Sequence, residues 1–138
     1  MTLDHDRIRD KLQDIHKSLE RLQRLRSLGR DGFLADEDSQ DIARSRLLTA
    51  IEAALNICFH VTAKKLKTVP EDYGDCFRSL GQANLIDASL AQRLADMARF
   101  RNRLVHLYWD IDYSSVYDII EHHLTDLEDF SARIAGLL

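Results

Sequence analysis

An apolar stripe with the spacing of an α-helix runs through the N-terminal part of this chain and limits what it can fold into. Isoleucines and leucines recur at alternating steps of four and three, at Ile8, Leu12, Ile15, Leu19 and Leu22. Side chains with that spacing lie on one face of a helix. The chain has one proline and no extended run of alternating apolar and polar residues that would favour a strand. We therefore expect an all-α fold.

The first helix should end near Gly29, with residues 29–39 as a loop. A second helix is expected to start between residues 39 and 42 and to bury Leu48, Ile51, Leu55, Cys58 and Phe59. Pro70 cannot continue a helix but can open a short one, from about residue 71 to residue 80, with Gly81 as its end.

A fourth helix should begin at Asp87, a plausible N-cap, and bury Leu90, Leu94, Met97 and Ala98. The segment 112–114 is expected to interrupt the helical structure. A final helix then follows, with one stripe of apolar residues at Val116, Ile120, Leu127, Phe130, Ile134 and Leu137. The sequence thus predicts an antiparallel bundle of four long helices and one short helix.

Length and composition indicate a single cytoplasmic domain. The 138 residues contain no linker-like segment, so we expect one domain over residues 1–138. The N-terminus lacks the apolar stretch of a signal peptide, and the apolar runs are too short for a membrane span. Cys58 and Cys76 fall in apolar surroundings and are expected to be reduced core residues.

The net charge of −4 argues against a protein that coats nucleic acid non-specifically. Two local clusters of cations are nevertheless present. Lys64, Lys65 and Lys67 are read as the solvated end of a helix, where cations suit the dipole. Arg99, Arg101 and Arg103 form the second cluster. Arg103 is interpreted as a side chain that is solvated or contacts phosphate, and Arg99 as one that either enlarges the phosphate-binding patch or narrows the cleft.

The arginine cluster belongs to a segment that carries the groups needed to cleave RNA. Arg101, His106 and Tyr108 place a permanent cation, an imidazole and a phenol within two helical turns. An imidazole transfers protons near neutral pH, a guanidinium matches phosphate oxygens, and RNA supplies its own nucleophile, the 2′-hydroxyl. The simpler interpretation is a capping cation beside two surface residues of an amphipathic helix.

The same segment resembles a known family. Arg101, Asn102, His106 and Tyr108 match the signature of the HEPN superfamily, in which four residues, the first of them polar, separate an arginine from a histidine and a tyrosine follows. Residues 97–112 (MARFRNRLVHLYWDID) resemble its HepT branch. Residues 47–61 and 79–102 are also similar to that branch. Arg99 is a departure, because a small residue is expected two positions before the motif arginine.

The resemblance implies a HEPN-like, dimeric toxin of a prokaryotic toxin–antitoxin pair. Such a toxin would be an endoribonuclease that needs no metal and no cofactor, with tRNA a reasonable guess for its substrate. Its partner would be a MntA-like nucleotidyltransferase that silences it by transferring AMP to Tyr108. The alternative is a catalytically weak HEPN module that dimerises and binds a nucleotidyltransferase or a nucleotide.

On an ideal helix Arg101 and His106 lie about 140° apart. Either the helix loosens after Val105, or a second copy of the chain completes the site. We expect His106 to transfer the protons and Arg101 to stabilise the charge on the phosphate, as the catalytic residues. Tyr108 is expected to contact the substrate through a hydrogen bond to a phosphate or a base. Asn102 is four residues before His106 and is expected to orient its ring.

Three further residue groups have a functional and a structural interpretation. Asp118, His122 and Asp126 recur at steps of four and could hold a metal, but a polar helix face satisfies the same pattern, so no metal site is predicted. His123 falls on the apolar stripe and is expected to be buried. Trp109 and Tyr113 are expected to close the core or a dimer seam rather than to stack bases.

Overall fold

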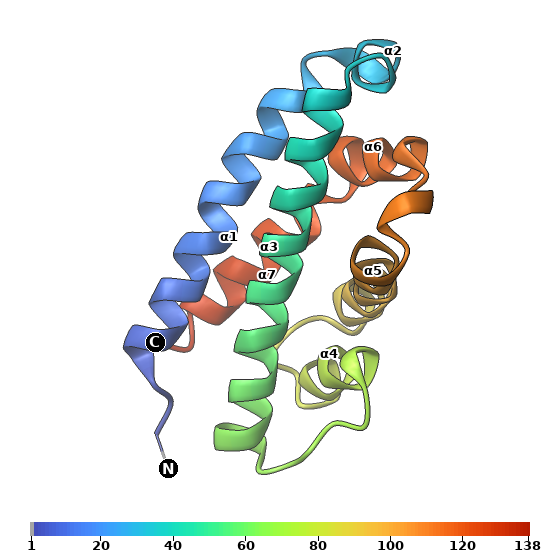
Figure 1. Ribbon diagram of the computed structural model, residues 1–138. Coiled ribbons are helices and arrows are strands. Elements are labelled where there is room, and N and C mark those ends of the chain that lie inside the picture. Colours follow the sequence, from blue (N-terminus) through green and yellow to red (C-terminus); the bar gives the residue numbers. More distant parts are fainter. Residues whose placement is uncertain (1) are drawn as a thin grey trace.

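The computed structural model describes residues 2–138, and all of the regular structure in that range is helical, which confirms the all-α prediction. Two long helices, α1 (His5–Arg26) and α3 (Glu37–Val61), run antiparallel and pack along each other, joined by the short α2 (Gly29–Leu34) (Figure 1). A π-helical turn, η1 (Thr62–Leu66), extends α3. It ends at Lys67, which adopts a left-handed conformation with φ 55°.

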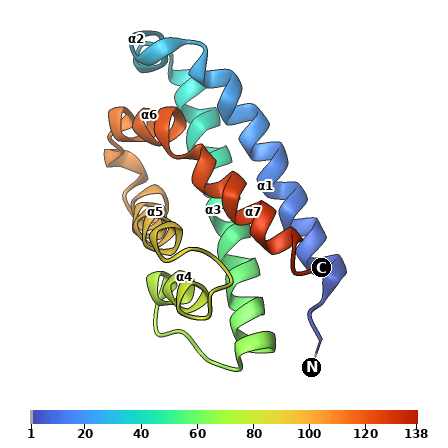
Figure 2. The same cartoon turned by 180° about the vertical axis from the view of Figure 1, so that it is seen from behind.

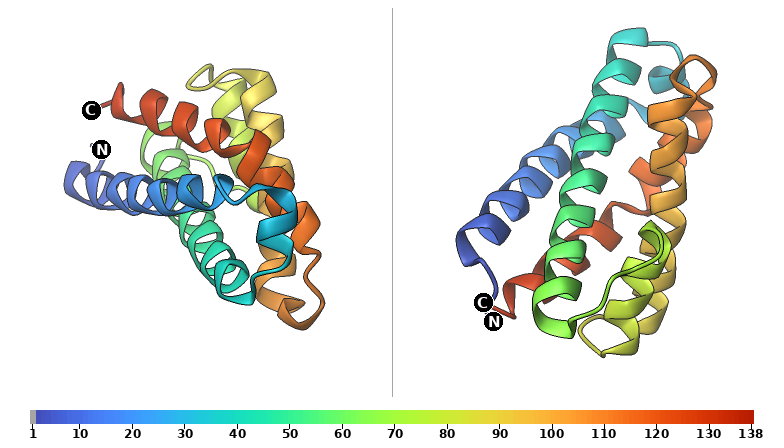
Figure 3. Two further views of the ribbon diagram at one scale, coloured as in Figure 1. Left: turned by 90° about the horizontal axis from the view of Figure 1, so that it is seen from above. Right: turned by 60° about the horizontal axis from the view of Figure 1, so that its bottom comes forward.

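The remaining helices cover one side of this pair. They are α4 (Tyr73–Gln82), α5 (Ala88–His106), the 3₁₀ turn η2 (Tyr108–Asp110), α6 (Tyr113–His122) and α7 (Leu124–Ala135). Seen from behind, α7 crosses α1 and α3 obliquely (Figure 2). The short helix α4 packs against α5 at the end of the bundle opposite α2 (Figure 3).

The core contains most of the apolar residues that the helical stripes predicted to be buried in α1 and α5. Ile8, Ile15, Leu19 and Leu22 of α1 are buried, and Leu12 is partly buried. The core face of α5 is buried as expected, at Leu90, Leu94, Met97 and Ala98. The segment Glu37–Leu66 is long and apolar enough to cross a membrane by composition alone, but 61% of its most apolar window is buried inside the bundle, so we interpret it as the core helix.

The loop predicted for residues 29–39 is wrong, because most of it is helical. Gly29 turns the chain with φ +71°, and α2 then places Phe33 in the core, where its ring packs against Tyr113 and Tyr117. Burial of one large aromatic ring stabilises a helix too short to persist alone. Helix α3 consequently begins at Glu37, earlier than expected.

Gly81 does not end α4, as the sequence suggested, but lies inside it and is buried. A Cβ atom on Gly81 would lie 2.8 Å from the Cβ of Ala91 in α5, so the glycine permits close packing of the two helices. The left-handed residue after α4 is Asn84, with φ 59°.

The prediction of a single final helix is also wrong, because the helix is interrupted at His123 and divides into α6 and α7. The break buries the carboxylate of Asp126, which accepts a hydrogen bond of 2.8 Å from Nε of Arg93. His123 is exposed rather than buried, and its Nδ1 lies 3.4 Å from the other oxygen of Asp126. The bundle therefore contains more helices, and shorter ones, than four long and one short.

Candidate functional site: the end of helix α5

The sequence motif lies at the C-terminal end of α5, where the chain leaves the helix. Leu104 is fully buried and anchors the last turn. The helix persists through His106 and stops at Leu107, whose φ of −126° and ψ of 38° are not helical. The chain then makes the η2 turn, closed by a hydrogen bond of 2.9 Å from the Asp110 amide to the Leu107 carbonyl. The regular helix therefore ends at His106, one residue beyond Val105, the residue after which the helix loosens in one of the two alternatives considered from the sequence.

Arg101 is held by two residues from other helices. Its Nε and Nη2 atoms lie 2.8 and 2.7 Å from Oε1 of Glu52 in α3. Its guanidinium also lies 5.1 Å from the ring centroid of Tyr73 in α4, a cation–π distance. Only 15% of the Arg101 side chain is exposed. The result is a cation in a fixed position and a partly dry environment.

His106 is exposed, so a substrate can reach its ring. Asn102 does not orient it in this structure: the Asn102 side-chain oxygen accepts a hydrogen bond of 3.3 Å from Arg101 Nη1. Within the described chain, no hydrogen bond joins Asn102 to His106. A single chain thus leaves Arg101 facing α3 and α4, while His106 faces solvent.

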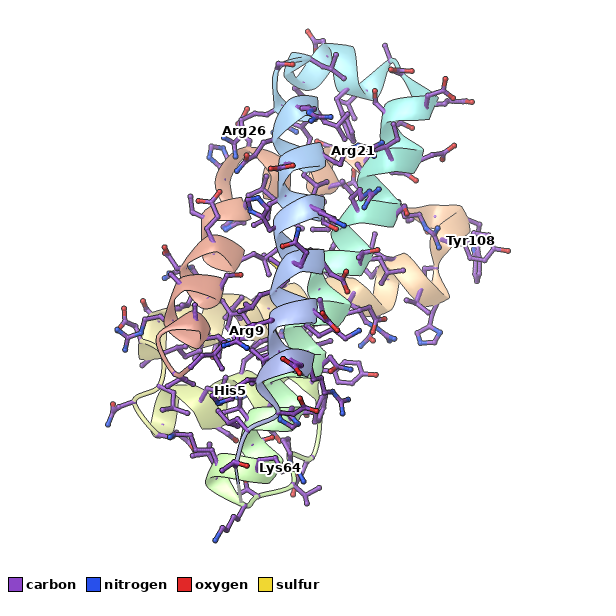
Figure 4. The ribbon with its side chains drawn as sticks, turned by 90° about the vertical axis from the view of Figure 1, so that its left-hand side faces the viewer. His5, Arg9, Arg21, Arg26, Lys64 and Tyr108 are labelled. Atoms are coloured by element: carbon purple, nitrogen blue, oxygen red, sulfur yellow. The ribbon has the colours of Figure 1, made fainter. Side chains whose placement is uncertain are left out.

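Tyr108 projects from the body of the bundle (Figure 4) and is 62% exposed. Because α5 ends at His106, Tyr108 does not fall in line with Arg101, as it would on a continuous helix. The cation beside it is Arg44 of α3, whose guanidinium lies 5.7 Å from the Tyr108 ring centroid. The same guanidinium donates a hydrogen bond of 2.9 Å to the Leu104 carbonyl. Arg44 therefore connects α3 to both the helix end and the tyrosine.

The other two arginines of the motif are exposed, as a contact with phosphate requires. Arg99 pairs with Asp96 at 3.0 Å and borders a hollow of about 470 Å³ between α4 and α5, which Asn102 and Tyr73 also line.

Hydrogen bonds from Ser115 and Ser114 lower the pKa of Asp112, and the charge of nearby Arg103 lowers it further.

Comparison with known proteins identifies the family. The model of the HepT-like ribonuclease family, "Ribonuclease HepT-like", matches residues 15–134. The chain belongs to the HepT-like ribonuclease family. It is 31% identical to the mRNA nuclease HepT of Shewanella oneidensis, over 91% of this chain and 94% of that protein. It is 29% identical to the tRNA nuclease HepT of Aphanizomenon flos-aquae, over 95% of this chain and 89% of that protein.

A solved structure of a tri-AMPylated Shewanella oneidensis HEPN toxin in complex with MNT antitoxin superposes with a TM-score of 0.86. It shares 30% identity, and the match covers 99% of each chain. These matches confirm the family and the function class predicted from the sequence, a ribonuclease toxin of the HepT type.

The sequence interpretation of this HepT-like chain missed Glu52, Tyr73 and Arg44, the residues that hold Arg101 and Tyr108. Glu52 is the one acidic residue in the apolar segment 47–61, but 45% of its side chain is exposed, and an exposed carboxylate needs no cationic partner. None of the three residues therefore gave a signal that predicts its contact.

The metal interpretation of Asp118, His122 and Asp126 has no geometric support, since the break at His123 places them on two helices. Asp118 pairs with Arg30, and His122 with Glu121 at 2.8 Å. Across residues 2–138 no group of three or more histidine, cysteine or acidic side chains is arranged to hold a metal ion.

The two cysteines of this HepT-like chain, Cys58 and Cys76, are free and fully buried, as expected. Burial and the neighbouring Cys76 raise the pKa of the Cys58 thiol. A thiol that stays protonated is a poor nucleophile, so Cys58 takes no part in the chemistry.

Proposed function

We propose that this protein is the toxin of a toxin–antitoxin pair and cleaves RNA with Arg101 and His106. The observation that carries the proposal is the arrangement of these two residues at the end of α5. Arg101 is held in place by Glu52 and Tyr73 and is mostly shielded from water, while His106 is open to solvent five residues later. A fixed cation and a free imidazole are the groups that a metal-independent ribonuclease requires.

In the proposed reaction, His106 takes the proton of a 2′-hydroxyl, and the oxygen attacks the adjacent phosphorus. The bond to the 5′-oxygen breaks, a second imidazole protonates that oxygen, and the products are a 2′,3′-cyclic phosphate and a free 5′-hydroxyl. Arg101 stabilises the charge that develops on the phosphate oxygens. Asn102 supports Arg101 through its side-chain oxygen.

The second imidazole is proposed to come from a second copy of the chain. Arg101 and His106 of one chain face different directions, so a homodimer with both motifs in a shared cleft would bring the required groups together. This assembly can be tested by mixing equal amounts of wild-type and His106→Ala chains. If cleavage needs both imidazoles, only dimers of two wild-type chains are active, and random exchange leaves about one quarter of the activity of the same total number of chains that are all wild type. If each chain works with its own imidazole alone, about one half remains.

Tyr108 is the proposed site of silencing. Its exposure allows the phenol oxygen to attack the α-phosphate of ATP and release pyrophosphate when a MntA-like nucleotidyltransferase binds the chain. The added phosphate would lie closer to Arg44 than to Arg101, since Arg44 is the cation beside Tyr108. An anion and an adenosine there would block the cleft and compensate the Arg44 charge. The chain has no glycine loop for phosphate, so the transferase is a separate protein.

The related nucleases act on mRNA in Shewanella oneidensis and on tRNA in Aphanizomenon flos-aquae, and we choose tRNA as the first substrate to test. We further propose that residues 1–138 act as one domain in the cytoplasm, away from the membrane, and use no cofactor.

One observation favours a second function, a catalytically weak module that binds a nucleotidyltransferase or a nucleotide. Glu52 compensates the charge of Arg101 in this structure, and a compensated guanidinium stabilises an extra negative charge less well. Under this alternative, Glu52 would hold the site inactive rather than position its arginine.

Cleavage of total tRNA in excess chelator distinguishes the two functions. Mass spectrometry first confirms that Tyr108 is unmodified. We expect the wild type to cleave the tRNA and His106→Ala to leave it intact, with His122→Ala as a matched control, because His122 is also an exposed histidine but lies on α6. DNA of the same sequence should survive, because it lacks the 2′-hydroxyl. No cleavage by the wild type would favour the binding module, and equal cleavage by His106→Ala would remove His106 from the site.

A further inference from the structure

The one tryptophan of the chain, Trp109, is exposed to solvent next to the proposed catalytic residue His106. Trp109 is in the η2 turn, three residues beyond His106, and is 70% exposed. Its neighbours Leu107 and Tyr108 are 43% and 62% exposed. Large apolar side chains are usually buried, so three consecutive exposed ones mark a contact surface. Trp109 therefore does not close the core, the first of the two places predicted for it, and the second, a seam between two chains, stays a prediction.

The support beneath Trp109 is ordered. The Tyr108 ring lies 5.3 Å from the Trp109 ring at an interplanar angle of 82°, an edge-to-face contact. The Arg44 guanidinium also contacts the Tyr108 ring and is itself held by a hydrogen bond to the Leu104 carbonyl. A short hydrogen-bonded turn fixes the backbone on both sides of the indole. An aromatic ring held in this way loses little conformational entropy when a flat ligand stacks on it.

The position of the three side chains favours RNA as the occupant. Arg103 is exposed one turn before His106, and Arg44 lies beside Tyr108. Asp110, directly after Trp109, is exposed as well. Nε of Arg44 is buried and has no hydrogen-bond partner within the described chain. Arginines beside an exposed aromatic ring occur in protein interfaces and in sites for single-stranded nucleic acid. Trp109 is three residues from His106, so the strand that His106 would cleave passes beside the indole.

We propose that Trp109 stacks on an unpaired base of the RNA next to the cleaved bond, so that Trp109 is a binding and specificity residue. The proposal rests on the RNA cleavage proposed above and adds a base-binding position to it. Every base has a flat π surface, so stacking would select unpaired RNA, such as a loop or a bulge, rather than one particular base. A base in a regular duplex is already stacked and cannot reach the indole.

The single tryptophan makes the contact directly observable. The experiment uses the His106→Ala chain, which keeps the RNA intact, and titrates it with an unstructured decaribonucleotide and with an abasic strand of the same length. We expect the RNA to quench the indole emission on binding and the abasic strand to leave it unchanged. Trp109→Ala should weaken RNA binding roughly 5- to 100-fold, Trp109→Phe should weaken it less, and binding of the abasic strand should not change.

The matched control is Val69→Ala, which shortens another exposed apolar side chain, in the segment before α4. It should leave RNA binding unchanged. In the otherwise wild-type chain, Trp109→Ala should raise KM for an unpaired RNA and leave kcat nearly constant.

Two results would overturn the proposal. One is RNA binding, followed by anisotropy of a labelled strand, without any change in indole emission. The other is a loss of dimers in Trp109→Ala by sedimentation, which would assign the indole to a seam between two chains. Failure of the proposed cleavage is a separate result, because the quenching is measured in a chain that does not cleave. Cleavage without quenching would contradict only the role of Trp109.

Discussion

The contact between α4 and α5 allows a quantitative prediction for Gly81→Ala. A Cβ atom at this position would lie 2.8 Å from the Cβ of Ala91, closer than Cβ atoms approach, and 3.5 Å from the backbone of Ala88. Overpacking of this kind costs about 1–3 kcal/mol, and the better helix propensity of alanine returns about 1 kcal/mol. We expect Gly81→Ala to lower the free energy of unfolding by about 1 kcal/mol, which lowers Tm by roughly 3 °C.

A double-mutant cycle isolates the clash. Ala91→Gly alone should cost about 2 kcal/mol, from the lost methyl burial and the lower helix propensity of glycine. In the double variant the methyl group has moved from one helix to the other, so we expect a favourable coupling of about 1–3 kcal/mol. Gly32→Ala is the control, because its Cβ would lie at an ordinary 3.5 Å from Leu28. Urea unfolding measures all four variants, and a coupling near zero would refute the close contact.

Three other predictions concern single side chains. Burial lowers the pKa of His60, whose Nε2 accepts a hydrogen bond of 2.9 Å from the Asp4 amide. The unfolded chain then binds more protons than the folded chain below pH about 6.5. The free energy of unfolding should therefore decrease as the pH is lowered below that value, by at most about 1.4 kcal/mol per pH unit, and the decrease should be smaller in His60→Gln. Glu52→Ala should reduce kcat about 10- to 100-fold because Arg101 loses its position, and a rise in kcat would favour the inactive-module alternative. Asp126→Asn should lower the unfolding free energy by about 1–2 kcal/mol in a denaturant titration, and an unchanged value would show that its ion pair contributes nothing.

The parts of this protein that the sequence predicted depend on residues close together in the chain. The stripe of α1 and the core face of α5 follow from helical periodicity, and both are buried as expected. The motif was visible because its residues span a single helix end. Asp87 occupies the N-cap position of α5, although its side chain makes no capping hydrogen bond.

The missed features depend on which helices meet. Gly81 has the signature of a helix end, and only the approach of Ala91 shows that its missing side chain serves packing. The break at His123 accompanies the burial of Asp126 against Arg93, a partner 33 residues away. Arg101 likewise obtains its carboxylate 49 residues earlier in the chain. Periodicity carries no information about such pairs.

The pairing of the arginines limits how this acidic protein can hold RNA. Arg101 is compensated by Glu52, Arg99 pairs with Asp96, and both pairs lie at the motif. The cations left near the helix end in the described chain are Arg44 and Arg103. In the proposed homodimer the shared cleft holds both copies of these two arginines, and four phosphate contacts on a single strand give a slope of about −2.8 in a plot of log affinity against log salt. Charge therefore supplies only part of the affinity for RNA on a chain of net charge −4, and contacts with unpaired bases supply the rest. That requirement is independent of the exposure of Trp109 and leads to the same base-binding surface.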